Sequence, residues 1–419
     1  MSCFERQAGF TGLRENYFLM KKLMNILGPG IITTALVFGP SKMTITSKMG
    51  ADYEYSLLWI VLVALFFMGI YTSMCSRIGA VHDKSLLTLI KENFNKGIGI
   101  AIGVGIFLVA TSFQAGNSIG VGIAIGEATG TPMYIWIIIF TAIAIALLFF
   151  PAFYRILEKL MLALILVMLA CFIATLFLAD IQFDKFFAGF VPAIPDGSIG
   201  LLIAFTASCF SLVGAFYQTY LIQERRKLTQ SAVNIKNSER GAFTGVAILG
   251  FMSAAVMVCA AAVLFPKGIH VGTAAEMGKA LEPLFGKHAS SLFFVGLFGA
   301  AFSSLIGNAT VGGALLGDAL GFGSSLSSKK VKILISIVMI LGCVVAITFG
   351  KLPLEFIVLA QSVTIFLVPF IGISIYVIGN SKKIMGENAN NLFYKIGGAL
   401  GLVVILVLMV SNVYDMFLK

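Results

Sequence analysis

Long runs of apolar residues, each followed by a short polar segment, alternate along most of the chain. A helix needs about 20 mostly apolar residues to cross the hydrocarbon core of a bilayer. Eleven segments meet this requirement, near residues 25–47, 56–78, 98–126, 133–150, 156–179, 199–223, 241–265, 290–320, 331–350, 354–379 and 393–414. The pattern predicts an all-α integral membrane protein, with a polar cytoplasmic tail at residues 1–24 and one transmembrane domain over residues 25–419.

The composition supports this prediction. Hydrophobic residues make up 59% of the 419 residues and charged residues only 11%, whereas soluble domains average about 25% charged residues. A soluble domain of this size could not bury so much apolar surface. The net charge of +10 is explained by basic loops on one side of a membrane, so we expect no nucleic-acid partner.

Lys and Arg are distributed unevenly between alternate connections. If the N-terminus is cytoplasmic, the inner segments carry 21 of these residues and the outer segments 7, with Lys42 as the last of the 29. Basic residues are enriched in cytoplasmic loops. We therefore predict a multi-pass protein of the plasma membrane whose N-terminus is cytoplasmic and whose C-terminus is outside.

The first span contains Gly39, Pro40 and Ser41 near its centre. Proline removes a backbone donor and clashes with the preceding turn, so the helix must kink or break there. Broken helices at membrane depth are tolerated where they face protein or a water-filled cavity, and they indicate the binding site of many transporters. A packing kink explains the same residues equally well.

Lys42 lies three residues after Gly39, far from both ends of its span. A charge at mid-membrane costs at least about 2.5–3.5 kcal/mol, and this lysine is poorly placed to extend to an interface. We therefore expect a functional or internally paired lysine.

Polar side chains gather in four other spans, although hydroxyls and amides often serve only to bond neighbouring helices. These residues are Ser112, Gln114, Asn117 and Ser118 in the third span, Tyr217, Gln218, Thr219 and Tyr220 in the sixth, Ser303, Ser304, Asn308 and Thr310 in the eighth, and Gln361, Ser362 and Thr364 in the tenth. The three histidines fall in loops, and the cysteines in apolar runs are typical of packing residues.

Several short motifs follow one another at characteristic spacing: Gly28-Pro29-Gly30, Gly39-Pro40, Tyr55-Ser56-Leu57-Leu58-Trp59, Gly214-Ala215 and the segment from Leu352 to Gln361. Their order and spacing resemble the GPG, DPGN, YSLLW and later motifs of the natural resistance-associated macrophage protein (NRAMP) family of divalent-metal transporters. The resemblance implies a LeuT-type fold, with two inverted five-helix repeats and an eleventh helix. The first and sixth spans would then be unwound near Gly39–Ser41 and Gly214–Tyr217.

This sequence departs from the family at its metal-binding positions. The aspartate and asparagine of DPGN correspond to Gly39 and Lys42, the sixth-span methionine to Gln218, and a nearby histidine to Tyr220. Methionine is the soft ligand that favours transition metals. The resemblance therefore implies a site from which the transition-metal ligands have been replaced.

The family's acidic proton path along the third helix corresponds to Gln114 and Asn117, which cannot change charge. Oxygen ligands of the family type remain at Ala215, by its carbonyl, and at Gln361. We expect no metal site, and if there is one, its ligands are Ala215, Gln218 and Gln361.

A metal dication would be repelled by a protonated Lys42. Two unit charges 4 Å apart interact by about 4 kcal/mol at an effective dielectric constant of 20, and a dication would feel about twice that. We therefore expect a secondary transporter that is not a proton-coupled manganese or iron importer and that moves a small polar or anionic solute. The candidate substrate-binding residues are Gly39, Ser41, Lys42, Ala215, Tyr217, Gln218, Tyr220 and Gln361, with Gln114 and Asn117 along the third-helix pathway.

Two alternatives remain. A neutral Lys42 would permit a divalent-cation transporter with a relaxed site, for example for Mg²⁺, which keeps several of its waters. A non-transporting receptor or assembly subunit is the other. No set of nucleophile, base and acid is present among the spans, so we expect neither an enzyme nor a cofactor, and we expect a monomeric transport unit.

Overall fold

The computed structural model describes residues 38–209, 212–229, 234–349 and 353–417. The predicted tail at residues 1–24 and the first half of the first span lie outside these ranges. Between them, the described chain forms the helices α2 (Pro40–Tyr53), α3 (Leu58–Val81), α4 (Leu86–Asn93), α5 (Lys96–Thr129), α6 (Met133–Leu147), α7 (Pro151–Leu178), α8 (Phe183–Ala188), α9 (Ile199–Cys209), α10 (Leu212–Thr229), α11 (Ile235–Val263), α12 (Ala274–Gly278), α13 (Glu282–Phe285), α14 (Ala289–Ala319), α15 (Lys329–Thr348), α16 (Pro353–Thr364), α17 (Val368–Asn380), α18 (Lys382–Met385) and α19 (Leu392–Phe417). Short 3₁₀ turns occur at Phe265–Lys267, Lys279–Leu281, Gly286–His288 and Gly386–Asn388.

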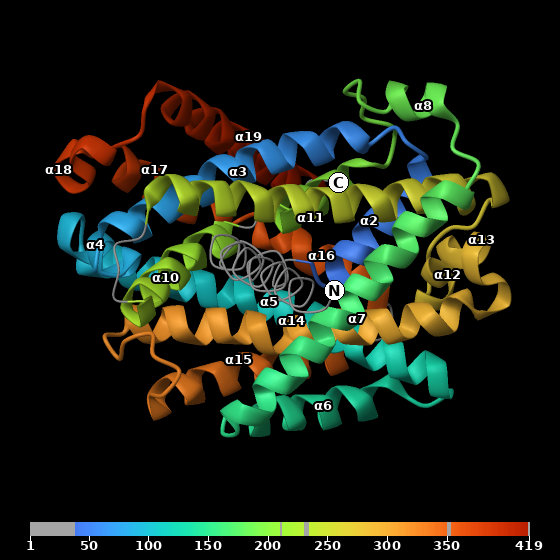
Figure 1. The fold of residues 1–419 in the computed structure, drawn as a ribbon, viewed down its shortest axis with the longest axis horizontal. Helices are drawn as coiled ribbons and strands as arrows, with labels where there is room; N and C mark the ends of the chain where they lie inside the picture. Colours follow the sequence, from blue (N-terminus) through green and yellow to red (C-terminus); the bar gives the residue numbers. More distant parts are fainter. Residues whose placement is uncertain (1–37, 210–211, 230–233, 350–352, 418–419) are drawn as a thin grey trace, which may run out of the picture.

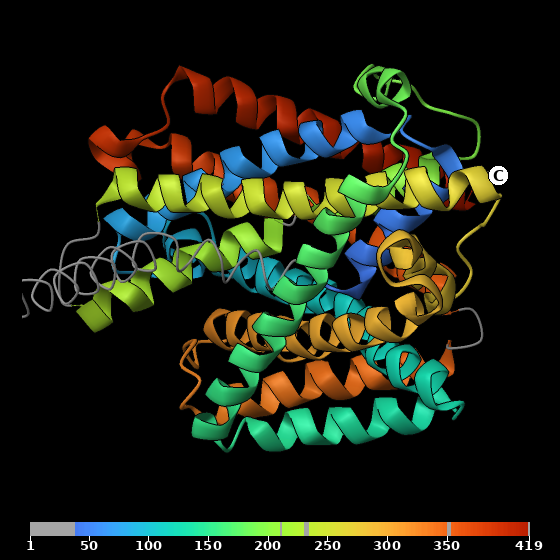
Figure 2. The same ribbon diagram turned by 45° about the vertical axis from the view of Figure 1, so that its right-hand side comes forward.

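The long helices form a layered bundle (Figures 1 and 2). Helices α5 and α14 lie side by side through its centre, α6 and α15 cover one side, and α3 and α19 cover the opposite side. The short helices α8, α12 and α13 lie at one end of the bundle, and α4 and α18 lie at the other. Among the described residues, seven helical segments are long and apolar enough to cross a membrane.

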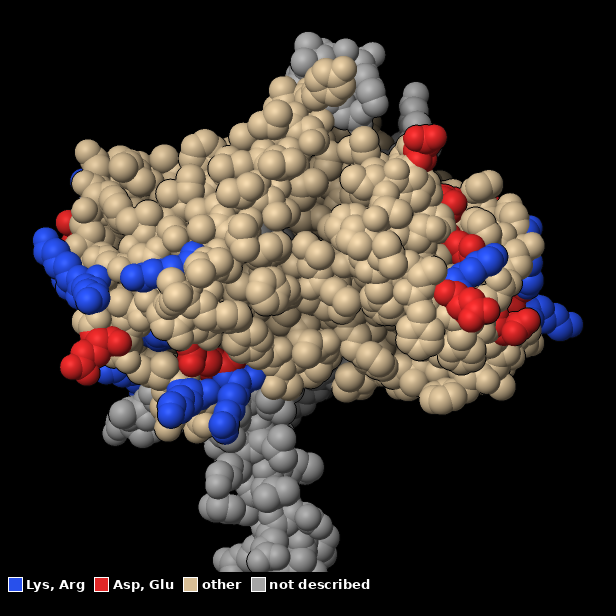
Figure 3. Space-filling model, turned by 90° about the horizontal axis from the view of Figure 1, so that it is seen from above, with Lys and Arg blue, Asp and Glu red and all other residues tan. Residues whose placement is uncertain are grey.

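Charged side chains are concentrated towards the two ends of the bundle, and a broad band without them lies between (Figure 3). This band carries exposed apolar side chains such as Leu108, Ile138, Val344 and Val407. Such a surface suits a lipid environment, because lipid chains replace water around it. The chain is therefore a multi-pass helical membrane protein.

The described helix of the first span, α2, begins at the Gly-Pro sequence where the break was predicted. Gly39 is extended, with φ −110° and ψ −173°, and Pro40 is the first residue of α2. Proline fits this position because its missing N–H would have no partner within the helix. The predicted unwinding is therefore found at Gly39, but Pro40 and Ser41 are helical.

The prediction for the sixth span is wrong in detail. Gly214–Tyr217 belong to α10, which begins at Leu212, so these residues are helical rather than unwound. The preceding helix α9 ends at Cys209, and residues 210–211 lie outside the described part of the chain. The unwinding that the family spacing predicted at Gly214–Tyr217 is therefore not found.

The tenth span has an interruption that the sequence analysis missed. Helix α16 ends at Thr364, and α17 begins at Val368 after a turn at residues 365–367. Pro369 stands in the first turn of α17, a position where proline is tolerated. This proline was the available signal for the interruption.

Glycines allow α2 to lie against α5. A Cβ atom added to Gly116 would lie 2.8 Å from Ser41 Oγ, and one added to Gly120 would lie 2.6 Å from the Pro40 ring. Small residues permit such close approach between membrane helices. The start of α2 is thereby held against the central helix.

A partly buried ion pair joins three helices near one end of the bundle (side chains of Arg77 and Glu239 8% and 22% exposed). The Arg77 guanidinium of α3 lies 2.7 Å from Glu239 Oε1 of α11, and its charged carbon lies 4.2 Å from the centroid of the Tyr394 ring of α19. Ser73 and Tyr394 share a 2.8 Å hydrogen bond beside it. The last helix is thus attached to the core by a polar contact.

We expect Arg77→Met to lower the free energy of unfolding by about 2 kcal/mol or more, because it leaves the largely buried Glu239 carboxylate without its charged partner. The control is Lys84→Met, which breaks the exposed pair with Glu92 (side chains 59% and 45% exposed) and should cost under about 1 kcal/mol. Thermal unfolding in detergent measures both. Equal losses in the two variants would contradict the proposed role of the Arg77 pair.

Candidate functional site

Lys42 is 1% exposed, and its amine extends from α2 to α9. The Nζ atom donates a 2.7 Å hydrogen bond to Cys209 Sγ and lies 5.2 Å from the centroid of the Phe205 ring. Cation–π attraction and a polarisable sulfur stabilise a buried amine without an opposite charge. None of the ion pairs between described side chains includes Lys42.

Gly39 faces α5 and α14. A Cβ atom at this position would lie 2.9 Å from Ser304 Oγ and 3.2 Å from Asn117 Oδ1. Ser304 and Asn117 are both buried. Two neutral oxygens therefore lie close to where the Cβ atom of any side chain at position 39 would stand. An aspartate at this position would require Ser304 to move.

The other predicted binding residues of the sixth span lie on α10. Ala215 and Gln218 are buried, and Tyr217 is half-buried and stacks on Tyr220 with ring centroids 6.3 Å apart. The backbone of Gln361 belongs to α16, but its side chain lies outside the described part of the structure. Helix α16 is tied to α5 just before this residue, where Ser112 donates to the Ala360 carbonyl at 2.7 Å.

Tyr220 makes its polar contacts at a different level of the bundle. Its hydroxyl donates a 2.6 Å hydrogen bond to Asp318 Oδ2 near the end of α14, and Ser85, which caps α4, donates to the same oxygen at 2.6 Å. A helix rises about 1.5 Å per residue, so Tyr220 stands about 12 Å beyond Leu212 along α10. The hydroxyl of Tyr220 thus joins α10 to α14 and α4 rather than to Lys42.

Further contacts close this end of the bundle. Gln223 donates to the carbonyl oxygens of His82 and Lys84 at 3.0 and 2.7 Å, and Thr219 donates to the Cys75 carbonyl at 3.1 Å. These bonds hold α10 against the end of α3 and the connection to α4. This is the end that the distribution of Lys and Arg in the sequence predicts to face the cytoplasm.

Gln114 and Asn117, which the sequence analysis grouped as one pathway, have different neighbours. Asn117 faces Gly39, whereas the Gln114 side chain lies against Gly342 of α15, where an added Cβ would come 2.4 Å from Gln114 Cγ. Both amide atoms of Gln114 are buried without a hydrogen-bond partner in the described structure. Gln114 therefore points between α5 and α15.

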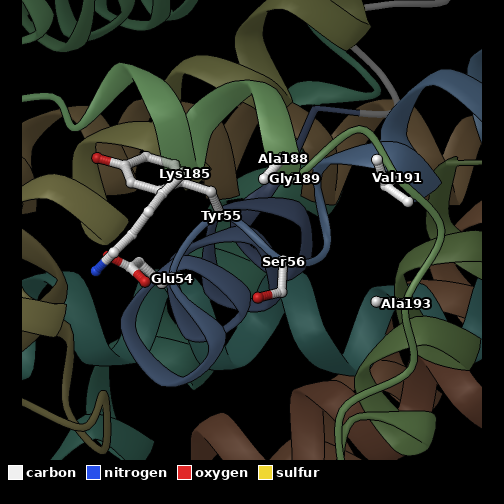
Figure 4. Close-up of a pocket in the computed structure, with 8 residues that line it drawn as sticks. All are labelled: Glu54, Tyr55, Ser56, Lys185, Ala188, Gly189, Val191 and Ala193. Atoms are coloured by element: carbon white, nitrogen blue, oxygen red, sulfur yellow. The ribbon is translucent and has the colours of Figure 1, made fainter.

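A cavity of about 220 Å³ lies at the opposite end, over the joint between α2 and α3 (Figure 4). Glu54 lines it with φ 55° and ψ −126°, a conformation rare outside glycine. Its carboxylate pairs with Lys185 at 2.9 Å, and the two side chains lie side by side in Figure 4. The backbone N–H of Trp59 donates to the Gly189 carbonyl at 2.9 Å. The segment around α8 therefore holds this strained joint in place.

Three residues of the site, Ser304, Cys209 and Phe205, could not be predicted from the sequence. Ser304 belonged to a noted polar cluster, but nothing in its spacing connected it to Gly39. Cys209 and Phe205 had the pattern of packing residues, and only the fold brings them to Lys42. In the described residues, no group of three His, Cys, Asp or Glu side chains gathers to hold a metal ion.

A multi-pass helical bundle in which α2 begins after an extended glycine, with a buried lysine in its first turn, has the features of a secondary transporter. Residues 30–415 match the family model described as "Natural resistance-associated macrophage protein-like". The chain therefore belongs to the NRAMP family. A similar relative is the "Divalent metal cation transporter MntH" of Deinococcus radiodurans, which is 22% identical over 402 residues that cover 93% of this chain and 89% of the relative.

Solved structures show the same fold. The manganese transporter of Eremococcus coleocola superposes with a TM-score of 0.75 at 18% identity, covering 95% of this chain and 89% of that one. The structure of MhsT in complex with L-phenylalanine matches with a TM-score of 0.58 at 16% identity, covering 92% and 98%. The predicted LeuT-type fold is confirmed, as is the resemblance to the NRAMP family.

We expect Tyr220→Phe to loosen the contact between α10, α4 and α14. Removing a buried hydrogen bond costs about 1–2 kcal/mol, which corresponds to about five- to thirtyfold more frequent opening. Hydrogen–deuterium exchange of residues 82–90 should therefore accelerate. The control is Tyr376→Phe, which removes only a bond to the Lys395 carbonyl. Equal exchange in wild type and Tyr220→Phe would contradict this role.

Proposed function

We propose that this chain transports a divalent metal cation by alternating access through a site at the start of α2, and that it takes a hard, partly hydrated ion such as Mg²⁺ in preference to Mn²⁺ or Fe²⁺. Family membership over residues 30–415 supports a cation as the cargo, as does the printed name of the Deinococcus radiodurans relative. This is the relaxed-site alternative of the sequence analysis.

The donor set around α2 is the observation that carries the preference for a hard ion. The oxygens next to Gly39 come from Asn117 and Ser304, and Gln218 replaces the soft methionine of the family. Transition metals favour sulfur and imidazole, whereas Mg²⁺ takes oxygen ligands and keeps several waters. Neutral oxygens that contact a hydrated ion through water can serve as such a site.

A second candidate cargo is a small polar or anionic solute, and the burial of Lys42 favours it. The amine contacts a thiol and an aromatic ring on α9 instead of a carboxylate, so an anionic cargo could supply the missing opposite charge. A protonated Lys42 would repel a dication by several kcal/mol at the distances within such a site. The candidate residues for this cargo are Gly39, Ser41, Lys42, Ala215, Tyr217, Gln218 and Gln361, together with Tyr220 if α10 shifts.

Calorimetric titration of the purified protein should show binding of Mg²⁺ and weaker or absent binding of Mn²⁺, because the soft and imidazole ligands are missing. In proteoliposomes, Mn²⁺ uptake should be far slower than that of a family member that keeps DPGN and the methionine, which serves as the matched control. Robust, saturable Mn²⁺ transport by the wild type would overturn the preference for a hard ion. Absence of any divalent binding would favour the solute.

Lys42→Met separates the two cargoes, since it removes the amine with nearly equal volume. If the cargo is a dication, its affinity should rise by about tenfold or more, because a repulsion of 1.4 kcal/mol already corresponds to a factor of ten. If the cargo is an anionic solute, its transport should be lost while the variant stays folded in detergent. Unchanged affinity and unchanged transport would show that Lys42 is a packing residue.

A further inference from the structure

A groove of about 480 Å³ opens on the bundle surface between α5, α17 and α4, and we call it the α5–α17 groove. Its α5 wall includes Ile98, Ala101, Ile102 and Gly105, which share one helix face because they are three or four residues apart. A Cβ atom added to Gly105 would approach only Leu367 Cδ2, at 3.9 Å. Small residues therefore hollow this wall.

The opposite wall belongs to α17. Phe370, Ile373 and Val377 repeat the same spacing there, and all three side chains are exposed. Ile90 and Phe94 of α4, the helix that precedes α5, complete the lining. A helix rises about 1.5 Å per residue, so each wall is about 10 Å long. A slot of this shape fits a hydrocarbon chain.

The lining offers a ligand little hydrogen bonding. Ser374 is the one lining residue with a polar side chain, and its hydroxyl donates to the Ile371 carbonyl at 2.7 Å. The other lining side chains are apolar. Exposed apolar residues of this bundle face lipid rather than water, so the groove is open to acyl chains and unsuited to a polar solute.

Basic residues stand at one end of the groove. Lys96 is the first residue of α5, two residues before Ile98, and Lys382 and Lys383 begin α18, five and six residues after Val377. Helices α4 and α18 lie at the same end of the bundle (Figure 1). The distribution of Lys and Arg in the sequence predicts that this end faces the cytoplasm, where the leaflet carries anionic lipids.

These three lysines are available to a ligand. They are exposed, and none of the ion pairs between described side chains includes them. The carboxylates nearest in the chain are Glu92, which pairs with Lys84 at 2.7 Å, and Glu387. The basic side chains are therefore in excess beside an apolar slot, which is the combination that an anionic phospholipid requires.

We propose that the α5–α17 groove binds one acyl chain of an anionic phospholipid whose headgroup lies among Lys96, Lys382 and Lys383. The chain would extend from these lysines towards Leu367, which belongs to the turn between α16 and α17. It would thereby fill the space between α5 and the second half of the interrupted tenth span. The inference does not rest on the proposed cargo, because lipid binding is measured without it.

Native mass spectrometry of the purified full-length protein in detergent tests this proposal. Phosphatidylglycerol and phosphatidylcholine with identical acyl chains are titrated separately, and the Kd of the first bound lipid is measured. Each lysine near the headgroup favours the anionic lipid by about fivefold, so wild type should prefer phosphatidylglycerol by about tenfold or more. Equal affinities for the two lipids would overturn the proposal.

The double variant Lys382→Gln/Lys383→Gln should lower the affinity for phosphatidylglycerol by about tenfold or more and leave that for phosphatidylcholine unchanged. The matched control, Lys329→Gln/Lys330→Gln, removes two adjacent exposed lysines at the start of α15 and should change neither affinity. Equal losses of phosphatidylglycerol affinity in the two double variants would show an effect of net charge alone and contradict the proposed headgroup site.

Ala101→Phe should lower the affinity for both lipids by about tenfold or more, because it fills the groove and the loss of about two buried methylene groups already has this effect. Ala101 is exposed, so the variant should stay folded. The matched control is Ala142→Phe on the exposed side of α6, which should bind both lipids as wild type does. Unchanged lipid binding in Ala101→Phe would overturn the proposal, and loss of a dimer in that variant would assign the groove to a second copy of the chain.

Discussion

A lysine amine in the interior of a membrane bundle must find partners within the protein, because lipid offers none. Lys42 finds them on α9, where Cys209 Sγ accepts its hydrogen bond and the Phe205 ring lies beneath it. This contact links the helix that starts at Gly39 to the first half of the sixth span. The glycines of α5 that receive Pro40 and Ser41 bring α2 close enough to the centre for the lysine to reach across.

The Lys42 amine and the side-chain oxygens near Gly39 lie on different sides of α2. The amine of Lys42 is directed to α9, whereas the oxygens of Asn117 and Ser304 approach Gly39 from α5 and α14. The distance between a cation and the amine decides their repulsion, which falls inversely with distance. A cation on the α5 and α14 side of α2 would therefore be repelled less than one on the α9 side, where the amine lies.

Hydropathy and family spacing predicted the membrane-spanning bundle and its LeuT-type fold. They also predicted non-helical backbone at Gly39, which precedes α2. They failed where side chains meet across helices. The family spacing located the sixth span but could not determine its backbone dihedral angles, and Gly214–Tyr217 are helical. The interruption in the tenth span was not predicted, although Pro369 was a signal for it. Tyr220 aligned with a site residue, yet its hydroxyl bonds Asp318 on α14. Only the fold brings Ser304 beside Gly39.

The two ends of the bundle are closed by different kinds of interaction, and this matters for alternating access. At the predicted inner end, Tyr220 and Ser85 share Asp318 Oδ2, so three helices depend on one carboxyl group. At the other end, the strained Glu54 is held by an ion pair with Lys185 whose lysine side chain is about half exposed. Exposed pairs contribute little, and backbone strain favours release. The hydrogen bonds to Asp318 therefore contribute more to the stability of their end of the bundle than the Glu54–Lys185 pair contributes to the other.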